Sequence, residues 1–213
     1  MHSMLHILDI VGTAVFAASG ALSASRKGMD IIGFCLLAAV TGIGGGTLRD
    51  VLLGVQPVSW LMQPGVILLC FGVALVSFFT AHHLESRERV LLWADAVGLA
   101  VFCVTGTQHA LAAGASPIAA VLMGAVTATF GGIIRDVLCN EKPLILYKEI
   151  YVTAAAAGAV VYVTTVPFMP DPRIAEILGL LTAFMARAGG LVASLSLPTY
   201  AKRPARPQET GRP

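Results

Sequence analysis

The second part of the chain repeats the first: residues 95–143 match residues 9–57 at a constant offset of 86 positions, without a gap. Of these 49 aligned positions, 21 carry the same residue in both copies. A sequence that repeats over this length is expected to build its fold from two copies of one structural unit. The identical positions include Asp9 and Asp95, Phe16 and Phe102, Gly20 and Gly106, Gly45 and Gly131, Arg49 and Arg135, and Asp50 and Asp136.

Seven stretches of the sequence are apolar over roughly 20 residues, the length that an α-helix needs to cross a bilayer. The chain is 56% hydrophobic and only 12% charged, with a mean hydropathy of +0.81, whereas soluble domains carry roughly 25% charged residues. We therefore predict an all-α integral membrane protein with a single transmembrane domain over residues 1–195. The predicted spans are residues 4–24, 31–53, 64–81, 90–112, 117–138, 147–168 and 174–195.

Each copy of the repeat contains three of these spans, about residues 5–81 in the first and 90–168 in the second. Because three is odd, the second copy must enter the membrane from the opposite side. The sequence thus predicts an inverted 3+3 repeat with a seventh helix, about residues 174–195, outside it. This architecture is typical of transporters and of some channels, and we expect no catalytic residues and no enzyme activity.

Basic residues favour one orientation, since short cytoplasmic loops carry an excess of Lys and Arg. The odd-numbered loops hold Arg26, Lys27, Arg87, Arg89, Lys142 and Lys148, whereas the second and fourth loops hold none. We expect the N-terminus outside, the C-terminus in the cytoplasm, and a bacterial inner membrane as the location. The basic, Pro-rich residues 198–213 are expected to be a disordered tail that contacts lipid. Neither a nucleic-acid partner nor a soluble protein partner is predicted.

Two simpler interpretations of single features have less support. A cleaved signal peptide could explain residues 4–24, but no Lys or Arg precedes this stretch and Asp9 interrupts it. The four cysteines lack the spacing of a metal site, and His109 has no carboxylate at helical spacing on its own span. We therefore predict no metal site and no cofactor, other than a permeant ion.

Both middle spans end in a glycine-rich motif, TGIGGGTLRD at residues 41–50 and TATFGGIIRD at residues 127–136. Glycine is less favourable than alanine in a helix by about 1 kcal/mol, so these motifs favour a kink or an unwound turn. Two such breaks could present carbonyl oxygens to a cation near the middle of the membrane. Close helix packing is the alternative, as Gly42 and Gly46 are four residues apart. The candidate pore residues are Thr41, Gly44, Gly45, Gly46, Thr127, Gly131 and Gly132.

An Arg-Asp pair follows each glycine motif, Arg49-Asp50 in one copy and Arg135-Asp136 in the other. Charged residues inside a span usually face a partner or a water-filled cavity. Adjacent helical residues point about 100° apart, so we predict pairing across the repeat, Arg49 with Asp136 and Arg135 with Asp50. Alternatively, both arginines extend to the lipid headgroups.

Asp9 and Asp95 occupy equivalent places in the first helix of each copy. Each lies about five residues inside its span, so the two carboxylates could form acidic mouths that concentrate cations at the two ends of a pathway. Placement near a helix N-terminus, where a carboxylate meets the positive end of the helix dipole, is an equally weighted alternative.

The paired motifs, Gly44 to Asp50 and Gly131 to Asp136, in two three-helix repeats plus a seventh helix, resemble those of the prokaryotic trimeric intracellular cation (TRIC) channel family. The resemblance covers about residues 5–195. It implies a homotrimer with a potassium-permeable pore in each protomer, between kinked second and fifth spans. Related bacterial sequences are also described as glycine transporters. The second motif departs from the first, because Phe130 stands where the first copy has Gly44.

Two functions are therefore expected from the sequence. The first is a monovalent cation channel, with potassium as the leading ion, in which Arg49 and Arg135 tether the kinked helices and control opening. The second is a secondary transporter of a small amino acid such as glycine. A purely structural subunit is a third, weaker alternative.

Overall fold

The computed structural model describes residues 2–84, 86–146 and 150–193. This part of the chain is entirely helical, as the sequence predicts. The long helices are α1 (His2–Arg26), α2 (Ile31–Leu52), α4 (Gly65–Thr80), α5 (Arg87–Ala112), α6 (Pro117–Leu138), α7 (Val152–Thr165) and α8 (Pro172–Ala193). The short elements are the helix α3 (Ser59–Met62) and the 3-10 turns η1 (Ala81–His83), η2 (Leu144–Leu146) and η3 (Val166–Phe168).

Six of these helices are long and apolar enough to cross a membrane, and the shorter apolar helix Val152–Phe168 completes the set of seven. The predicted spans agree with them to within a few residues. Helix α3 was not predicted, since its four residues lie in the short loop between two predicted spans. Tyr147, Lys148, residues 194–195 and the tail at 198–213 lie outside the described residues.

Local sequence explains where the helices begin and end. The Asp30 side chain accepts a hydrogen bond from the Gly33 amide at 2.8 Å and caps the start of α2. Ser116 caps α6 in the same way, just before Pro117. Gly28 and Gly114, which are equivalent in the repeat, follow α1 and α5 with φ angles of +64° and +86°. Glycine adopts this left-handed conformation readily, so both copies terminate their first helix with the same device.

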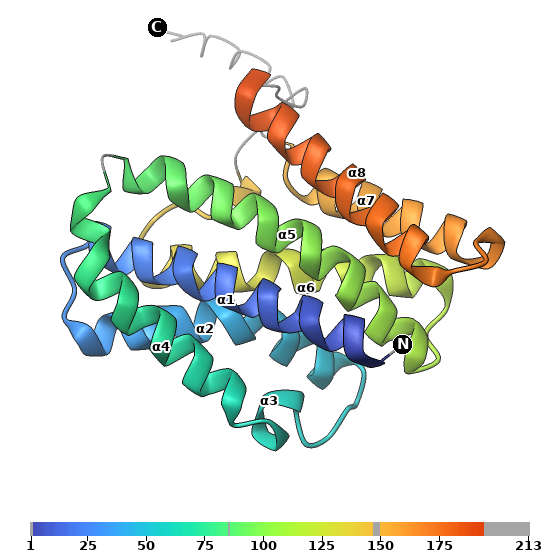
Figure 1. Cartoon of the computed structure of the whole chain (residues 1–213), viewed down its shortest axis with the longest axis horizontal. Helices are drawn as coiled ribbons and strands as arrows, with labels where there is room; N and C mark the ends of the chain where they lie inside the picture. Colours follow the sequence, from blue (N-terminus) through green and yellow to red (C-terminus); the bar gives the residue numbers. More distant parts are fainter. Residues whose placement is uncertain (1, 85, 147–149, 194–213) are drawn as a thin grey trace, which may run out of the picture.

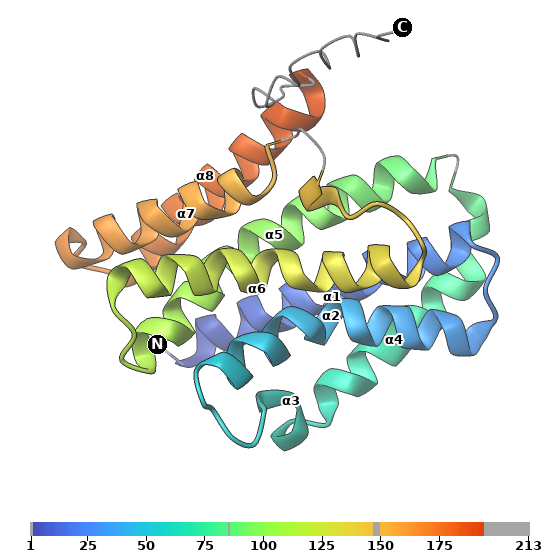
Figure 2. The same ribbon diagram turned by 180° about the vertical axis from the view of Figure 1, so that it is seen from behind.

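Helix packing follows the repeat. In the first copy α1, α2 and α4 pack against one another, and α5, α6 and α7 form the matching set in the second. The two sets meet where α1 packs on α5 and α2 packs on α6. Figure 1 shows α1 and α5 along the middle of the molecule, and Figure 2 shows α2 and α6 side by side on the opposite face. Helix α8, outside the repeat, packs on α5 and α7.

Side-chain contacts fix the relative direction of the two copies. Near the start of α1, Asp9 contacts His109 near the end of α5. At the other end of α1, the Ser25 carbonyl accepts a hydrogen bond from Arg87 at the start of α5. The helices α1 and α5 are therefore antiparallel, which confirms the predicted inverted repeat. We refer to the two ends of the bundle as the His109 end and the Arg135 end, after the residues that lie there.

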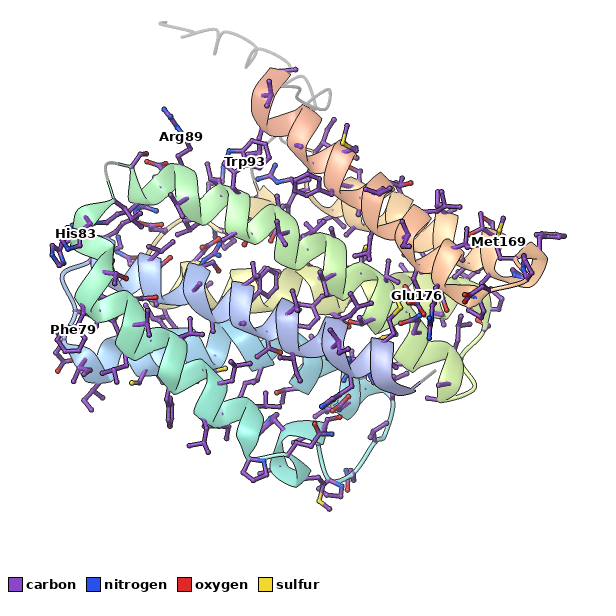
Figure 3. All side chains as sticks on the ribbon, viewed as in Figure 1. Phe79, His83, Arg89, Trp93, Met169 and Glu176 are labelled. Atoms are coloured by element: carbon purple, nitrogen blue, oxygen red, sulfur yellow. The ribbon has the colours of Figure 1, made fainter. Side chains whose placement is uncertain are left out.

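The outer surface is apolar where it would meet lipid. Leu68, Val76 and Phe79 on α4 and Met185 and Val192 on α8 are all more than half exposed. Figure 3 shows Phe79 projecting away from the bundle. Exposed apolar surface of this kind marks contact with lipid or with another protein, so it agrees with a multi-pass membrane protein.

Candidate functional site

The glycine motifs lie where α2 and α6 cross. A Cβ atom at Gly45 would overlap the Thr127 carbonyl oxygen, and one at Gly131 would overlap the Thr41 carbonyl oxygen. These two glycines therefore let the helix backbones touch, as the close-packing alternative proposes. Both helices are described in full and run through their motifs without interruption. The predicted unwound turn is thus not found, because carbonyl groups at the crossing remain in the helical hydrogen-bond pattern.

The other residues of the motifs have different surroundings. The Thr41 hydroxyl donates to the Leu37 carbonyl at 2.6 Å, and the Thr127 hydroxyl donates to the Met123 carbonyl at 2.7 Å. Each threonine therefore satisfies its own helix, a common arrangement in apolar helices. The remaining glycines face neighbours from other parts of the site: a Cβ at Gly44 would contact Ile134, one at Gly46 would contact Arg49, and one at Gly132 would contact Tyr151 and Asp95.

Phe16 and Phe102 form the centre of the bundle. Their ring centroids are 5.2 Å apart with an interplanar angle of 58°, a favourable geometry for aromatic pairs. Each ring lies against a glycine of the other copy: Phe16 against Gly98, and Phe102 against Gly12. These two glycines are equivalent in the repeat. Phe16 and Phe102 are identical residues at equivalent positions of the repeat. This identity could have indicated the pair, but no role was predicted for either ring from the sequence.

At the His109 end, Arg49 pairs with its neighbour Asp50. Arg49 Nε and Nη2 lie 2.9 and 2.8 Å from Asp50 Oδ1. The other carboxylate oxygen accepts hydrogen bonds from the amide and hydroxyl of Ser59, at 2.8 and 2.6 Å, and so anchors the start of α3. The predicted pairing of Arg49 with Asp136 is wrong, because antiparallel α2 and α6 place the two Arg-Asp pairs at opposite ends of the bundle.

Asp9 is hydrogen-bonded to His109, for which no partner was predicted from the sequence. Asp9 Oδ2 accepts a hydrogen bond from His109 Nε2 at 2.8 Å. No carboxylate lies at helical spacing on the span of His109, and this partner comes instead from α1, 100 positions earlier. Both side chains are partly exposed, and the role of Asp9 as a pore mouth stays a prediction.

A cavity of about 120 Å³ opens at the His109 end. It lies between α1, α2, α5 and the loop that carries α3, and it is large enough for a few water molecules. Negative and positive groups both face it. Its lining includes Asp9, Thr13, Gly46, Arg49, Gln63 and, at the centre of the bundle, Phe102.

At the Arg135 end, the second arginine has more partners than the first. Arg135 Nε donates to Asp136 Oδ1 at 2.9 Å, and Nη1 donates to Asp95 Oδ1 at 2.8 Å and to Ser19 Oγ at 3.0 Å. Asp136 Oδ2 accepts from the Leu144 amide at 3.0 Å. The predicted pairing of Arg135 with Asp50 is therefore wrong, because Asp50 lies at the opposite end of the bundle.

Asp95 is not an open mouth in this structure. Its side chain is fully buried beside Arg135, whereas Asp9, the equivalent residue, is partly exposed. Tyr151, at the start of α7, is also buried, and its hydroxyl lies 3.0 Å from where a Cβ on Gly132 would be. The arginine, the aspartate and the tyrosine are therefore packed together at this end of the bundle.

A larger cavity, of about 380 Å³, lies at the same end of the bundle and is lined in part by Arg135. Charged residues dominate its lining, and Glu141 forms ion pairs with Arg26 at 3.3 Å and with Lys27 at 3.0 Å. Arg135 and Asp136 form the part of the lining nearest the bundle centre. The lining also includes Arg26, Glu88, Glu141 and Lys142.

A family model described as "Glycine transporter" matches residues 6–82 and 92–167, which are the two copies of the repeat. The chain belongs to this family. Membership of a membrane transport family agrees with the prediction that the chain is not an enzyme, and the two-part match agrees with the repeat.

Relatives within the family extend the match to nearly the whole chain. The inner membrane protein YadS of Escherichia coli K12 is 40% identical over 203 residues, covering 93% of this chain and 97% of YadS. A TRIC orthologue from Rhodobacter sphaeroides is 52% identical, with a TM-score of 0.88 over 91% of this chain and 100% of that one. A prokaryotic TRIC channel crystallised in 0.5 M KCl is 34% identical, with a TM-score of 0.86 over 92% and 100%. The resemblance to the prokaryotic TRIC family is thus confirmed.

One further buried polar pair lies outside the repeat's motifs. Gln108 Nε2 donates to Glu176 Oε1 at 2.6 Å, and Glu176 is almost fully buried. Figure 3 shows Glu176 where α8 meets the end of α5. This pair ties α8 to the second copy, and nothing in the local sequence around Glu176 indicated its partner.

Proposed function

We propose that this chain forms a cation channel, with potassium as the leading permeant ion, and that each protomer conducts along α2 and α6. The observation that carries the proposal is the pair of charged cavities, which approach the α2–α6 crossing from opposite ends of the bundle. The TRIC structures that are 34–52% identical to the chain support the same class of function.

The charges suit a cation more than an anion. Both arginines face a cavity, but each is neutralised by the aspartate that follows it. At the His109 end, Asp9 adds a carboxylate to the lining, whereas at the Arg135 end Glu88 and Glu141 are balanced by Arg26 and Lys142. Carboxylates at the mouths of a narrow path raise the local concentration of cations and lower that of anions.

Phe16 and Phe102 separate the two cavities in our proposal. An apolar constriction excludes water and ions until its side chains move apart. Conduction would therefore require displacement of this ring pair, through movement of α1 against α5. The candidate pore residues Thr41, Gly44, Gly45, Gly46, Thr127, Gly131 and Gly132 would set how far α2 and α6 can slide at their crossing.

The assembly and orientation follow from the same argument. We propose a homotrimer in a bacterial inner membrane, in keeping with the description of the R. sphaeroides orthologue as trimeric and of YadS as an inner membrane protein. Arg26, Lys27, Arg87, Arg89 and Lys142 all lie at or beside the Arg135 end. That end would face the cytoplasm, with the His109 end outside.

Transport of a small amino acid such as glycine is the second candidate. The description of the family favours it, and so does one feature of the His109 cavity. That cavity presents Asp9 and Arg49 together, so an ammonium and a carboxylate group of one small zwitterion would both find a partner.

Planar-bilayer recording of the purified protein in asymmetric KCl, with and without glycine, tests these proposals. A channel gives discrete unitary currents that reverse near the potassium equilibrium potential and do not need glycine. Silence in the bilayer, combined with gradient-driven uptake of glycine into liposomes, would refute the channel and support the transporter. The variant Phe34→Ala, altered in a buried cluster between α2 and α4, controls for loss of stability.

A further inference from the structure

A buried carboxyl group and a carboxamide join α8 to the end of α5, away from both cavities. Glu176 on α8 is only 7% exposed, and Gln108 Nε2 donates a hydrogen bond to its Oε1 atom at 2.6 Å. Figure 3 shows Glu176 at the place where the two helices meet. Neither residue lines either of the two cavities described above, so this pair is separate from the path that we propose for ions.

The single hydrogen bond between these groups leaves two buried oxygen atoms unsatisfied. Among the described residues, neither Glu176 Oε2 nor Gln108 Oε1 has a hydrogen-bond partner. Both atoms are acceptors when the carboxyl group is ionised, so neither can satisfy the other. A buried acceptor without a donor is unfavourable, and a buried carboxylate without a cation is more so.

One proton on Glu176 would satisfy both oxygen atoms. A neutral carboxyl group has one O–H donor and keeps an oxygen atom that accepts. With the proton on Oε2, Glu176 would donate to Gln108 Oε1 while its Oε1 atom still accepts from Gln108 Nε2. The two groups then close a ring of two hydrogen bonds, which the ionised carboxylate cannot form. Exchanging the nitrogen and oxygen atoms of the carboxamide gives the same ring, with the proton on the other carboxyl oxygen.

The titratable and charged groups around the pair do not take the place of that proton. On α5, His109 bonds Asp9 of α1. On α7, Tyr162 lies beside both members of the pair, but a phenol carries no positive charge. On α8 itself Arg173 is exposed, and the adjacent turn η3 has no titratable residue. In this part of the chain, as far as the structure describes it, no cation stabilises an ionised Glu176.

Close packing of α5, α7 and α8 next to the pair favours a proton over a larger ion. Three residues after Glu176, a Cβ atom at Gly179 would lie 3.0 Å from Val104 Cγ2 and 3.1 Å from Tyr162 Cβ. Val104 in turn is four residues before Gln108 on α5. Helices packed at this distance leave little room for an ion with its water shell, whereas a proton needs no additional volume.

The repeat shows that the carboxamide belongs to the contact with α8. The first copy has Leu22 at the position equivalent to Gln108. Leu22 is buried in an apolar cluster with Ala81 and Leu91. The position is therefore apolar in the first copy and polar in the second, where Glu176 of α8 faces it.

We propose that Glu176 is a proton-binding site, which holds one proton in a double hydrogen bond with Gln108, and that release of this proton weakens the attachment of α8 to α5. On release, the O–H bond of the carboxyl group breaks, the proton passes to water, and the carboxylate keeps the electron pair. Two acceptors and an uncompensated charge then remain in the helix contact. The inference goes beyond the proposed function, because it requires no ion conduction and can be tested without measuring it.

Infrared difference spectroscopy of the full chain in lipid vesicles detects the bound proton. The C=O stretch of a neutral carboxyl group lies at a higher frequency than the bands of carboxylates and amides. Subtracting the spectrum of Glu176→Gln from that of the parent should leave one such band. The matched control is Glu88→Gln, which changes an exposed glutamate at the start of α5 and should leave no band. The exchanged pair Gln108→Glu/Glu176→Gln should show the band of the parent, because acid and amide form the same ring in reverse order.

The melting temperature as a function of pH tests the attachment of α8. A proton that the folded chain holds and the unfolded chain has released stabilises the fold, and this stabilisation is lost as the pH rises. The melting temperature of the parent should therefore fall over the pH interval in which the acid band disappears. Glu176→Gln cannot release this proton and should keep its melting temperature over the same interval, whereas Glu88→Gln should follow the parent.

The absence of an acid band that depends on Glu176 would overturn the proposal. The same holds for an equal pH dependence of the melting temperature in the parent and in Glu176→Gln. If Glu176→Gln does not fold, Gln108→Leu, which introduces the residue of the first copy, serves instead. Its acid band should lie at a higher frequency than that of the parent, because the C=O group loses the hydrogen bond from Nε2. An unshifted band would overturn the double hydrogen bond with Gln108.

Discussion

Arg135 Nη1 lies 2.8 Å from Asp95 Oδ1, and both side chains are fully buried. This ion pair joins α6 to α5 within the second copy of the repeat, next to the ring of Tyr151. Arg135 also bonds Asp136 and Ser19. In the first copy, the side chain of Arg49 bonds Asp50 alone among the described residues, and this contrast leads to the first prediction.

Arg135→Ala should destabilise the protein much more than Arg49→Ala does. Without Arg135, the carboxylates of Asp95 and Asp136 are left together without a cation, and removal of one partner of a buried ion pair costs about 3–5 kcal/mol. Asp50 keeps two hydrogen bonds from Ser59 when Arg49 is removed, so that loss should be smaller. The melting temperature of each variant in detergent, determined by size-exclusion chromatography after heating, measures the two losses of stability.

The double variant Arg135→Ala/Asp95→Ala is the control for this interpretation. It removes one of the two orphaned charges and should recover part of the lost melting temperature. Equal losses for Arg49→Ala and Arg135→Ala would contradict the difference in hydrogen-bond partners that we describe.

Gly45→Ala should prevent normal packing of α2 on α6, since the new methyl group would overlap the Thr127 carbonyl oxygen. Gly46→Ala, one residue further on, is the matched control, because its Cβ would lie 3.8 Å from Arg49 Nη2 and, among the described residues, would meet no atom of another helix within 4 Å. Alanine is a better helix former than glycine by about 1 kcal/mol, so Gly46→Ala should keep or raise the melting temperature. If both variants melt alike, the glycines do not act through close approach.

Phe102→Ala should increase the passive leak of potassium from loaded liposomes. The substitution removes half of the ring pair that separates the two cavities and leaves space over Gly12. Phe34→Ala removes the same side chain from the cluster between α2 and α4, with a similar expected loss of about 3–5 kcal/mol, but should not increase the leak. A potassium-selective electrode outside the liposomes measures the leak for both variants. An equal leak in Phe34→Ala would mean that the substitutions loosen the fold in general.

Asp50→Ala should release the loop between α2 and α4. The carboxylate of Asp50 accepts two hydrogen bonds from Ser59 and fixes the start of α3. Hydrogen–deuterium exchange of peptides that contain Ser59 should therefore become faster. Asp30→Ala removes a capping carboxylate from the same helix, at an expected loss of about 1 kcal/mol, and should leave exchange at Ser59 unchanged. Slow exchange at Ser59 in Asp50→Ala would show that other contacts hold the loop.

Much of the fold could be predicted because it depends on features that are local in the sequence. Apolar stretches of the length of a membrane, ended by Gly28 and Gly114 and begun by Asp30 and Ser116, define helices wherever they occur. The 86-residue repeat adds the relation between the copies, since an odd number of spans inverts the second one. The equivalence of Asp9 with Asp95 and of Arg49 with Arg135 follows from alignment alone.

The partners of the charged residues could not be predicted, because they come from other helices. Angular spacing along one helix argued against the pair Arg49 and Asp50, yet a long arginine side chain can turn back to its neighbour. Pairing across the repeat was excluded only by the antiparallel packing of α2 on α6. The bond between His109 and Asp9 likewise depends on α5 lying antiparallel to α1.

The sequence by itself thus determined the helices, their number and their inverted symmetry, because hydrophobic length and repetition act along the chain. Only the tertiary structure decided how that symmetry is broken. Asp95 is buried against Arg135 and Asp9 is held by His109, although the two aspartates are equivalent in sequence. The physical reason is that an ion pair forms with whichever group packing brings within reach, and packing brings His109 to Asp9 but Arg135 to Asp95.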